Sequence, residues 1–204
     1  MEVLELKAVK KQKILAYIAK KSKDDFHDFD IPKLNEFLKK KKINYVTVDF
    51  NVDMKEFRVS ELGKTLQSLG IKYYQVDIPE YAMGYLYEEI VEKEALLNLL
   101  FEEYENLEDK NSYKGESLKN WIDMIKEEIQ AKEIFISLKL RPQWIVKKML
   151  DIANKFENKE VLFIHFVQED ICEDICSEVT ELLRTLNVKV IQYVKKHNII
   201  NIEF

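Results

Sequence analysis

The sequence predicts a three-layer α/β fold, in which a mostly parallel, Rossmann-like sheet of five or six strands carries helices on both faces. Short β-branched and aromatic segments alternate with longer segments of helical period, which is the pattern of strand–helix–strand units. All three prolines stand at strand-to-helix junctions, where a missing backbone N–H loses no hydrogen bond. Two parallel neighbours need a crossover connection, so this alternation indicates parallel strands.

The clearest unit lies in the first half of the chain. Ile43–Phe50 is apolar and too short for a helix, so it is predicted to be a buried strand. Ser60–Leu69 repeats apolar residues at helical spacing and stops before Gly70, a residue that tolerates the left-handed end of a helix. Ile71–Ile78 is the second strand. A similar helix-to-strand stretch near the C-terminus has Asn187 in place of the glycine, and duplication or shared packing rules would each explain it.

Two elements precede this unit. Ile14–Ala19 is predicted to be a strand, because polar loop residues follow it directly. A short helix, Leu34–Lys42, follows Pro32 and ends in four lysines, which suit the negative pole of a helix. A nucleic-acid or membrane contact is the alternative interpretation of these lysines.

A pair of long helices interrupts the alternation after the second strand of the unit. Glu80–Leu107 has a broad apolar stripe, and a second stripe follows Ser117 after a polar loop. We expect this helical hairpin to cap an edge of the sheet or to form a contact with another subunit or a partner protein. The chain is therefore predicted to be a single α/β domain, 1–204, with a helical insertion at about 80–132.

The alternation of strands and helices resumes after the insertion. Glu160–Val167 (EVLFIHFV) is the most apolar strand and is predicted to lie inside the sheet. The remaining expected elements are a strand at Ile134–Leu140, a helix from Pro142 to Phe156, a helix at Gln168–Leu186, a strand at Val188–Val194 and an edge strand at Asn198–Phe204, for which an antiparallel direction is one alternative.

Composition excludes several classes of site. The chain has only 4 glycines and lacks the glycine-rich loops that hold nucleotide phosphates. It has 29 lysines but only 3 arginines and a net charge of −5, which argues against sequence-specific recognition of nucleic acid. The first 44 residues carry +5 and the remainder −10. An acidic helix and a basic N-terminal region could therefore pair between the subunits of a homo-oligomer.

Location is predicted from the cysteines and from hydropathy. Cys172 and Cys176, the two cysteines of the chain, lie four residues apart on an expected helix and are interpreted as small apolar residues in a reducing compartment. No signal peptide is recognised, and no apolar run reaches the roughly 20 residues that span a bilayer. A cytoplasmic protein without a membrane segment is predicted.

Acidic and histidine side chains gather where the carboxyl ends of the predicted strands meet. In a parallel sheet these ends share one edge, which is where ligands bind. Asp49, Asp77 and His165 are the candidate catalytic residues, and Asp49, Asp53, Asp77 and His27 are the candidate ligands of Mg²⁺ or Mn²⁺.

A structural interpretation competes with each of these roles. Acids are common at helix starts, where they cap backbone N–H groups, and Asp77 has capping-box spacing to Glu80. Asp49 is harder to explain in this way, because it lies within an apolar run and a buried carboxylate needs a partner. His165, inside an apolar strand, is alternatively a hydrogen-bonded core histidine.

Two functions follow from these observations, and no motif identifies the chain as an enzyme. The first is a non-catalytic, cytoplasmic α/β protein that binds a small ligand or a partner protein. The second is a phosphoester hydrolase or nuclease that depends on a divalent metal held by acids at the ends of the strands.

Overall fold

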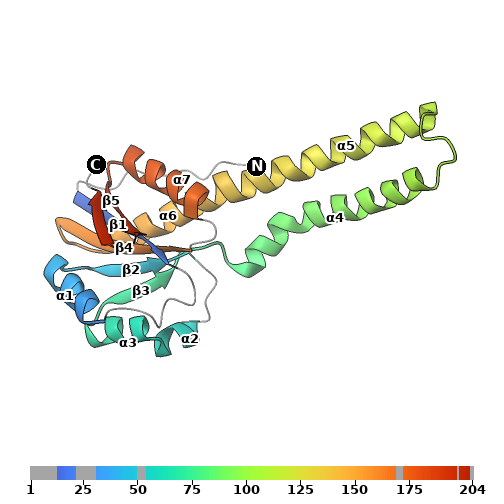
Figure 1. Ribbon diagram of the computed structural model, residues 1–204. Coiled ribbons are helices and arrows are strands. Elements are labelled where there is room, and N and C mark those ends of the chain that lie inside the picture. Colours follow the sequence, from blue (N-terminus) through green and yellow to red (C-terminus); the bar gives the residue numbers. More distant parts are fainter. Residues whose placement is uncertain (1–12, 22–30, 50–53, 169–171, 197, 203–204) are drawn as a thin grey trace. The chain divides into compact units, whose positions relative to one another are not determined.

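The computed structural model describes residues 13–21, 31–49, 54–168, 172–196 and 198–202 (Figure 1). The chain divides into two compact units. The α/β unit consists of Met1–Asp77 and Leu140–Phe204, and the helical unit is Ile78–Lys139.

Six strands form one sheet in the described part of the chain, in the order β3-β2-β4-β1-β5-β6. The first five strands in this order are parallel, and β6 runs antiparallel to β5. The predicted α/β fold with a mostly parallel sheet is therefore confirmed. The strands are β1 (Lys13–Lys21), β2 (Tyr45–Val48), β3 (Lys72–Gln75), β4 (Glu160–Gln168), β5 (Lys189–Lys196) and β6 (Asn198–Ile202).

Helices cover both faces of the sheet, as Figure 1 shows. The chain moves from β1 through β2 to one edge, and it later moves in the opposite direction from β4 to β5. Because parallel crossovers are right-handed, helices of the two directions lie on opposite faces. One face carries α1 (Ile31–Lys41), α2 (Met54–Val59) and α3 (Glu61–Ser68), and the other carries α6 (Arg141–Ala153) and α7 (Cys172–Thr185).

Alternation along the interior strands decides which side chains meet which helices. Tyr45 and Phe163 belong to the cluster that contains the buried residues of α6 and α7, and their rings stack at 4.9 Å. Val46 and Ile164 belong to the opposite cluster, under α1 and α3. Since neighbouring residues of a strand point to opposite faces, every second residue after Tyr45 and Phe163 lies on the α6 side.

The helix ends follow the local sequence rules. Ser60 caps α3, because its side chain accepts a hydrogen bond from the Gly63 backbone N–H at 3.1 Å. Gly70 and Asn187 have φ angles of 66° and 61°, so both adopt the predicted left-handed conformation after a helix. The short helix α2 has no counterpart in the sequence prediction. The edge strand expected from Asn198 is β6, which runs antiparallel to β5, and β4 lies inside the sheet as predicted.

The prediction of a strand at Ile134–Leu140 is wrong. Helix α5 (Tyr113–Ile134) continues into a π-helical segment, Phe135–Leu140, which leads directly into α6. A short apolar run fits a buried helix as well as a strand, because periodicity cannot separate the two at this length. Pro142 cannot donate to the preceding turn, and the wider π-helical turn just before it accommodates such a residue within a helical segment.

The helical unit is a hairpin of α4 (Glu80–Glu105) and α5, which confirms the predicted helical insertion. Leu100 of α4 packs with Leu118, Ile122 and Ile125 of α5 in a buried core. Ion pairs also join the two helices, including Lys93 with Glu128 at 2.8 Å. The antiparallel helices therefore bury one apolar stripe of each against the other.

Membrane insertion is not indicated by the described helices, none of which combines the length and apolar character of a bilayer span. The prediction that 1–204 form a single domain stays a prediction. The helical unit contains the insertion expected at about 80–132.

Candidate functional site at the carboxyl edge of the sheet

Three predicted residues meet at the carboxyl edge of neighbouring parallel strands. Asp49 directly follows β2, and Asp77 lies two residues after the end of β3. His165 lies in β4, where it is the register partner of Thr47 in β2. The parallel pairing of β2 with β3 and of β2 with β4 produces this meeting, as the sequence predicts.

Arg141, at the start of α6, joins the ends of β2 and β3. Its Nε and Nη2 atoms donate to the two carboxylate oxygens of Asp77 at 2.8 and 2.6 Å. Nη2 also donates to the backbone oxygen of Asp49 at 3.2 Å. The side chains of Arg141 and Asp77 are only 16% and 13% exposed, so this bidentate pair is largely shielded from water.

Asp77 does not cap α4, so the capping-box interpretation of this residue is wrong. The N-cap residue of α4 is Pro79, which makes no side-chain capping bond. Pairing with a guanidinium satisfies both carboxylate oxygens of Asp77 at once, which a single capping bond to Glu80 could not do.

His165 is a buried and neutral histidine. Its side chain is fully buried, and its Nδ1 lies 3.0 Å from the Thr47 hydroxyl oxygen. The pKa of His165 is lowered to about 3: burial is the main cause, a hydrogen bond at Thr47 partly opposes it, and the positive charge of Arg141 adds a smaller lowering. The imidazole is therefore uncharged throughout the physiological range of pH.

Asp49 is fully buried on the α6 side of the sheet, close to this imidazole. Its Oδ2 lies 3.8 Å from Nε2 of His165, which is beyond hydrogen-bond distance. Within the described residues Nε2 of His165 has no hydrogen-bond partner. The backbone N–H of Asp49 points to the Phe166 oxygen at 3.4 Å, which extends the β2–β4 ladder by one residue.

The candidate metal site is only partly covered by the structure. His27 and Asp53 lie outside the described residues. Within the described ranges no three His, Cys, Asp or Glu side chains are grouped so that they could hold a metal ion. The guanidinium of Arg141 already supplies positive charge to Asp77, so a divalent ion would have to displace it there.

The arrangement is better suited to holding the strand ends together than to proton transfer. A general acid or base works best when its pKa lies near the working pH, and His165 is far below that range. Both carboxylate oxygens of Asp77 are already engaged by Arg141. The described side chains of this edge therefore form a polar cluster that orders the ends of β2 and β3 around Arg141.

Sequence reasoning missed the parts played by Arg141 and Thr47. One signal was present: a chain with 29 lysines keeps few arginines, and two of them, Arg58 and Arg184, are exposed. An arginine at the start of a helix in such a lysine-rich chain indicates a need for bidentate geometry, which lysine cannot supply. Thr47 carries no comparable signal.

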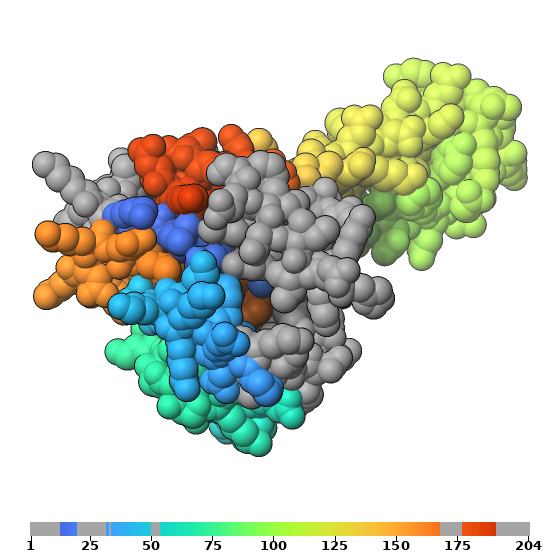
Figure 2. Space-filling model, turned by 60° about the vertical axis from the view of Figure 1, so that its left-hand side comes forward, coloured from blue at the N-terminus to red at the C-terminus, as the bar shows by residue number. Residues whose placement is uncertain are grey.

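A second feature is the helical hairpin, which Figure 2 draws in green and yellow. Both of its helices carry large exposed apolar side chains. Leu96 and Leu99 of α4 are 36% and 64% exposed, and Trp121 and Met124 of α5 are 44% and 50% exposed. We call these four residues the hairpin patch. Contiguous exposed apolar surface on a folded protein commonly marks an interaction site.

Comparison with known proteins returned no match: no family model, no curated protein and no solved structure is similar to this chain. Function must therefore be argued from the geometry of the carboxyl edge and of the hairpin patch.

Proposed function

We propose that this chain is a non-catalytic α/β protein that binds a partner protein through the α4–α5 hairpin. One observation supports this proposal above the others: the hairpin keeps Leu96, Leu99, Trp121 and Met124 exposed although its own core is already filled. Exposed tryptophan and methionine are over-represented in protein interfaces. The partner is either a second copy of the chain or another protein.

The neutral state of His165 supports the non-catalytic part of the proposal. With a pKa of about 3 it is uncharged and a weak base near neutral pH, which suits it poorly to general acid–base catalysis. A small ligand at the carboxyl edge is the other form of the binding hypothesis. To bind Asp77, such a ligand would have to displace Arg141, and to bind Arg141 it would have to displace Asp77. The hairpin is therefore the favoured binding element.

A photo-crosslinking amino acid at position 124 tests the proposal in living cells. We expect a covalent adduct with a defined protein when it replaces Met124, because this position lies in the hairpin patch. The matched control replaces Lys119, which is exposed on the same helix but turned well away from Met124. The adduct is detected by gel shift and identified by mass spectrometry. Equal labelling from both positions, or none from either, would contradict partner binding by this surface.

A divalent-metal phosphoester hydrolase is the second candidate, favoured by the meeting of Asp49, Asp77 and His165 at one edge. We expect the melting temperature of the protein to stay unchanged when millimolar MgCl₂ or MnCl₂ is added, because Arg141 already neutralises Asp77. Differential scanning fluorimetry measures this. A metal-dependent rise that disappears in a folded Asp49→Asn variant would establish a metal site and favour the hydrolase.

A further inference from the structure

The register of the two hairpin helices brings the four residues of the hairpin patch to one level. Glu103 pairs with Lys114 at 2.7 Å, and Lys93 pairs with Glu128 at 2.8 Å. The stretch of α4 between these two pairs therefore faces the stretch of α5 between them. Leu96 and Leu99 lie in the first stretch, and Trp121 and Met124 lie in the second.

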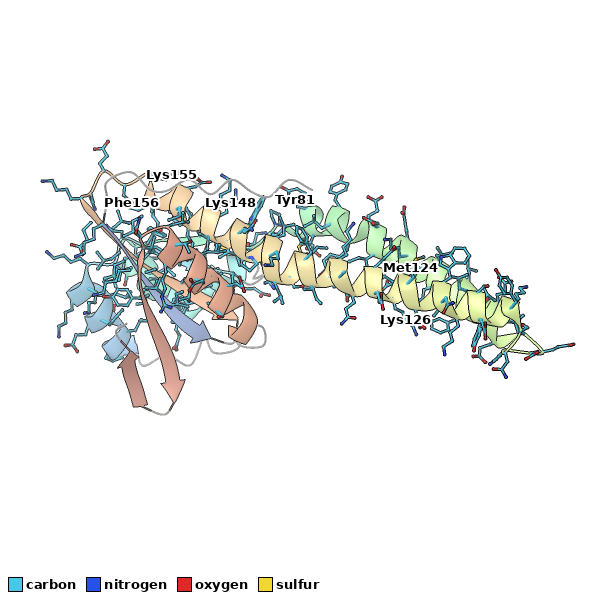
Figure 3. All side chains as sticks on the ribbon, turned by 90° about the horizontal axis from the view of Figure 1, so that it is seen from above. Tyr81, Met124, Lys126, Lys148, Lys155 and Phe156 are labelled. Carbon is cyan, nitrogen blue, oxygen red and sulfur yellow. The ribbon has the colours of Figure 1, made fainter. Side chains whose placement is uncertain are left out.

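Helical spacing places the patch on one flank of the hairpin. Leu96 and Leu99 are three residues apart, and so are Trp121 and Met124, so each pair lies on one side of its helix. In Figure 3 Met124 and Lys126 extend from α5 in different directions, as expected for residues two positions apart. Lys126 lies over the ring of Phe101 at 4.7 Å, which places it on the other flank.

Acidic side chains border the patch. Glu92 precedes Leu96 by four residues, and Glu128 follows Met124 by four, so both lie beside it on their helices. Glu88, one turn before Glu92, extends the acidic border along α4. The helical unit as a whole has 15 acidic residues and 7 lysines, a net charge of −8, whereas the rest of the chain has a net charge of +3.

This charge distribution disfavours a second hairpin as the occupant of the patch. Two such units face to face would bring together surfaces of the same strong sign, and like-charge contacts oppose association. An anionic membrane surface or a nucleic acid would be repelled for the same reason. A basic surface with apolar side chains is complementary in both properties.

We infer that the hairpin patch binds a basic amphipathic helix of another protein. This inference rests on the proposed function and adds the chemistry of the partner. Apolar side chains of the partner helix at i, i+3, i+4 and i+7 contact Leu96, Leu99, Trp121 and Met124. Its lysines or arginines face the acidic border at Glu88 and Glu92, and the two helices of the hairpin with the partner helix form a three-helix arrangement.

The test uses a synthetic helical peptide with leucines at these four spacings and lysines elsewhere, titrated into the full-length protein by isothermal calorimetry. A scrambled peptide of identical composition controls for charge alone. We expect the patterned peptide to bind at least about tenfold more tightly than the scrambled one, because only it presents a continuous apolar stripe. We expect Leu99→Ser/Met124→Ser to abolish this difference. The apolar control Val91→Ser, exposed on α4 but turned away from Leu96, is expected to retain it.

Charge variants test the acidic border separately. Glu88→Gln/Glu92→Gln is expected to weaken binding of the patterned peptide several-fold at low salt, and Glu94→Gln/Asp123→Asn, on the other flank, is expected to leave it unchanged. Equal binding of both peptides, no binding, or equal effects of the two charge variants would overturn the inference.

Sedimentation of the unliganded protein separates this inference from the proposed function. A dimer that dissociates in Leu99→Ser/Met124→Ser would identify a second copy of the chain as the partner. That result would overturn this inference and retain partner binding by the hairpin patch.

Discussion

Replacing Arg141 with methionine is expected to lower the free energy of unfolding by roughly 2–4 kcal/mol. Methionine keeps much of the length of the side chain but removes the guanidinium, so the largely shielded carboxylate of Asp77 loses both of its hydrogen bonds to Arg141. The contact with the backbone oxygen of Asp49 is lost as well. Urea denaturation followed by circular dichroism measures the change.

The same helix offers a matched control. Lys147 pairs with Asp151 at 3.4 Å, and the two side chains are 40% and 52% exposed. Lys147→Met is expected to change stability by less than about 0.5 kcal/mol, because exposed pairs of this kind contribute little. Arg141→Lys should recover only part of the loss, since an ammonium group cannot make the bidentate contact. Equal effects of Arg141→Met and Lys147→Met would show that burial gives the Asp77 pair no special weight.

The Asp77–Arg141 pair also explains how the sheet carries a long helical insertion. Asp77 is the last residue of the α/β unit before the hairpin, and Arg141 follows the return of the chain at Leu140 by one residue. The ion pair therefore joins the two points at which the chain leaves and re-enters this unit. Because Arg141 also contacts the end of β2, the pair fixes these points to two strands of the sheet.

The sheet itself was predictable because its signals are local. β-branched runs and the left-handed residues Gly70 and Asn187 each report on a few neighbouring residues. Pro142 was misleading, because it follows a helical segment and not a strand. The error at Ile134–Leu140 has a different origin. A short apolar segment of this kind suits a buried strand and a buried helix equally well. The choice depends on its continuity with α5 and α6, which no local pattern encodes.

The candidate site was predictable only in part for the same reason. Parallel strands share a carboxyl edge, so a common edge for Asp49 and His165 could be predicted from the sequence. Their close approach depends on the pairing of β2 with β4, which the sequence pattern does not specify. The partner of Asp77 lies 64 residues away in sequence, on a helix that follows the insertion. The capping rule, which considers only neighbouring residues, predicts that Asp77 caps a helix. In the structure Asp77 instead accepts two hydrogen bonds from Arg141.

The stability of the protein is expected to fall in acid partly because His165 is buried in its neutral form. The pKa of this residue is about 3 in the folded protein and about 6.5 when it is exposed in the unfolded chain. The unfolded state therefore binds a proton first as the pH falls below about 6.5, and stability is lost progressively until the folded pKa is reached. At pH 5 the loss from this residue is roughly 2 kcal/mol relative to neutral pH.

The variant His165→Gln isolates this contribution, because glutamine retains polar atoms near Thr47 but does not titrate. Unfolding by urea is measured between pH 7.5 and pH 4.5 for both proteins, whose other ionisable groups are identical. Glutamine is expected to destabilise the protein at pH 7.5, since its shape differs from that of imidazole in a closely packed site. The deficit should then shrink by roughly 2 kcal/mol at pH 5, because only the wild type loses stability through His165.

Among the described groups, Asp49 and Arg141 are the charged residues shown facing the imidazole: Asp49 would favour its protonation and Arg141 opposes it. A deficit that stays constant with pH would mean that Asp49 outweighs burial and that His165 titrates near its ordinary pKa.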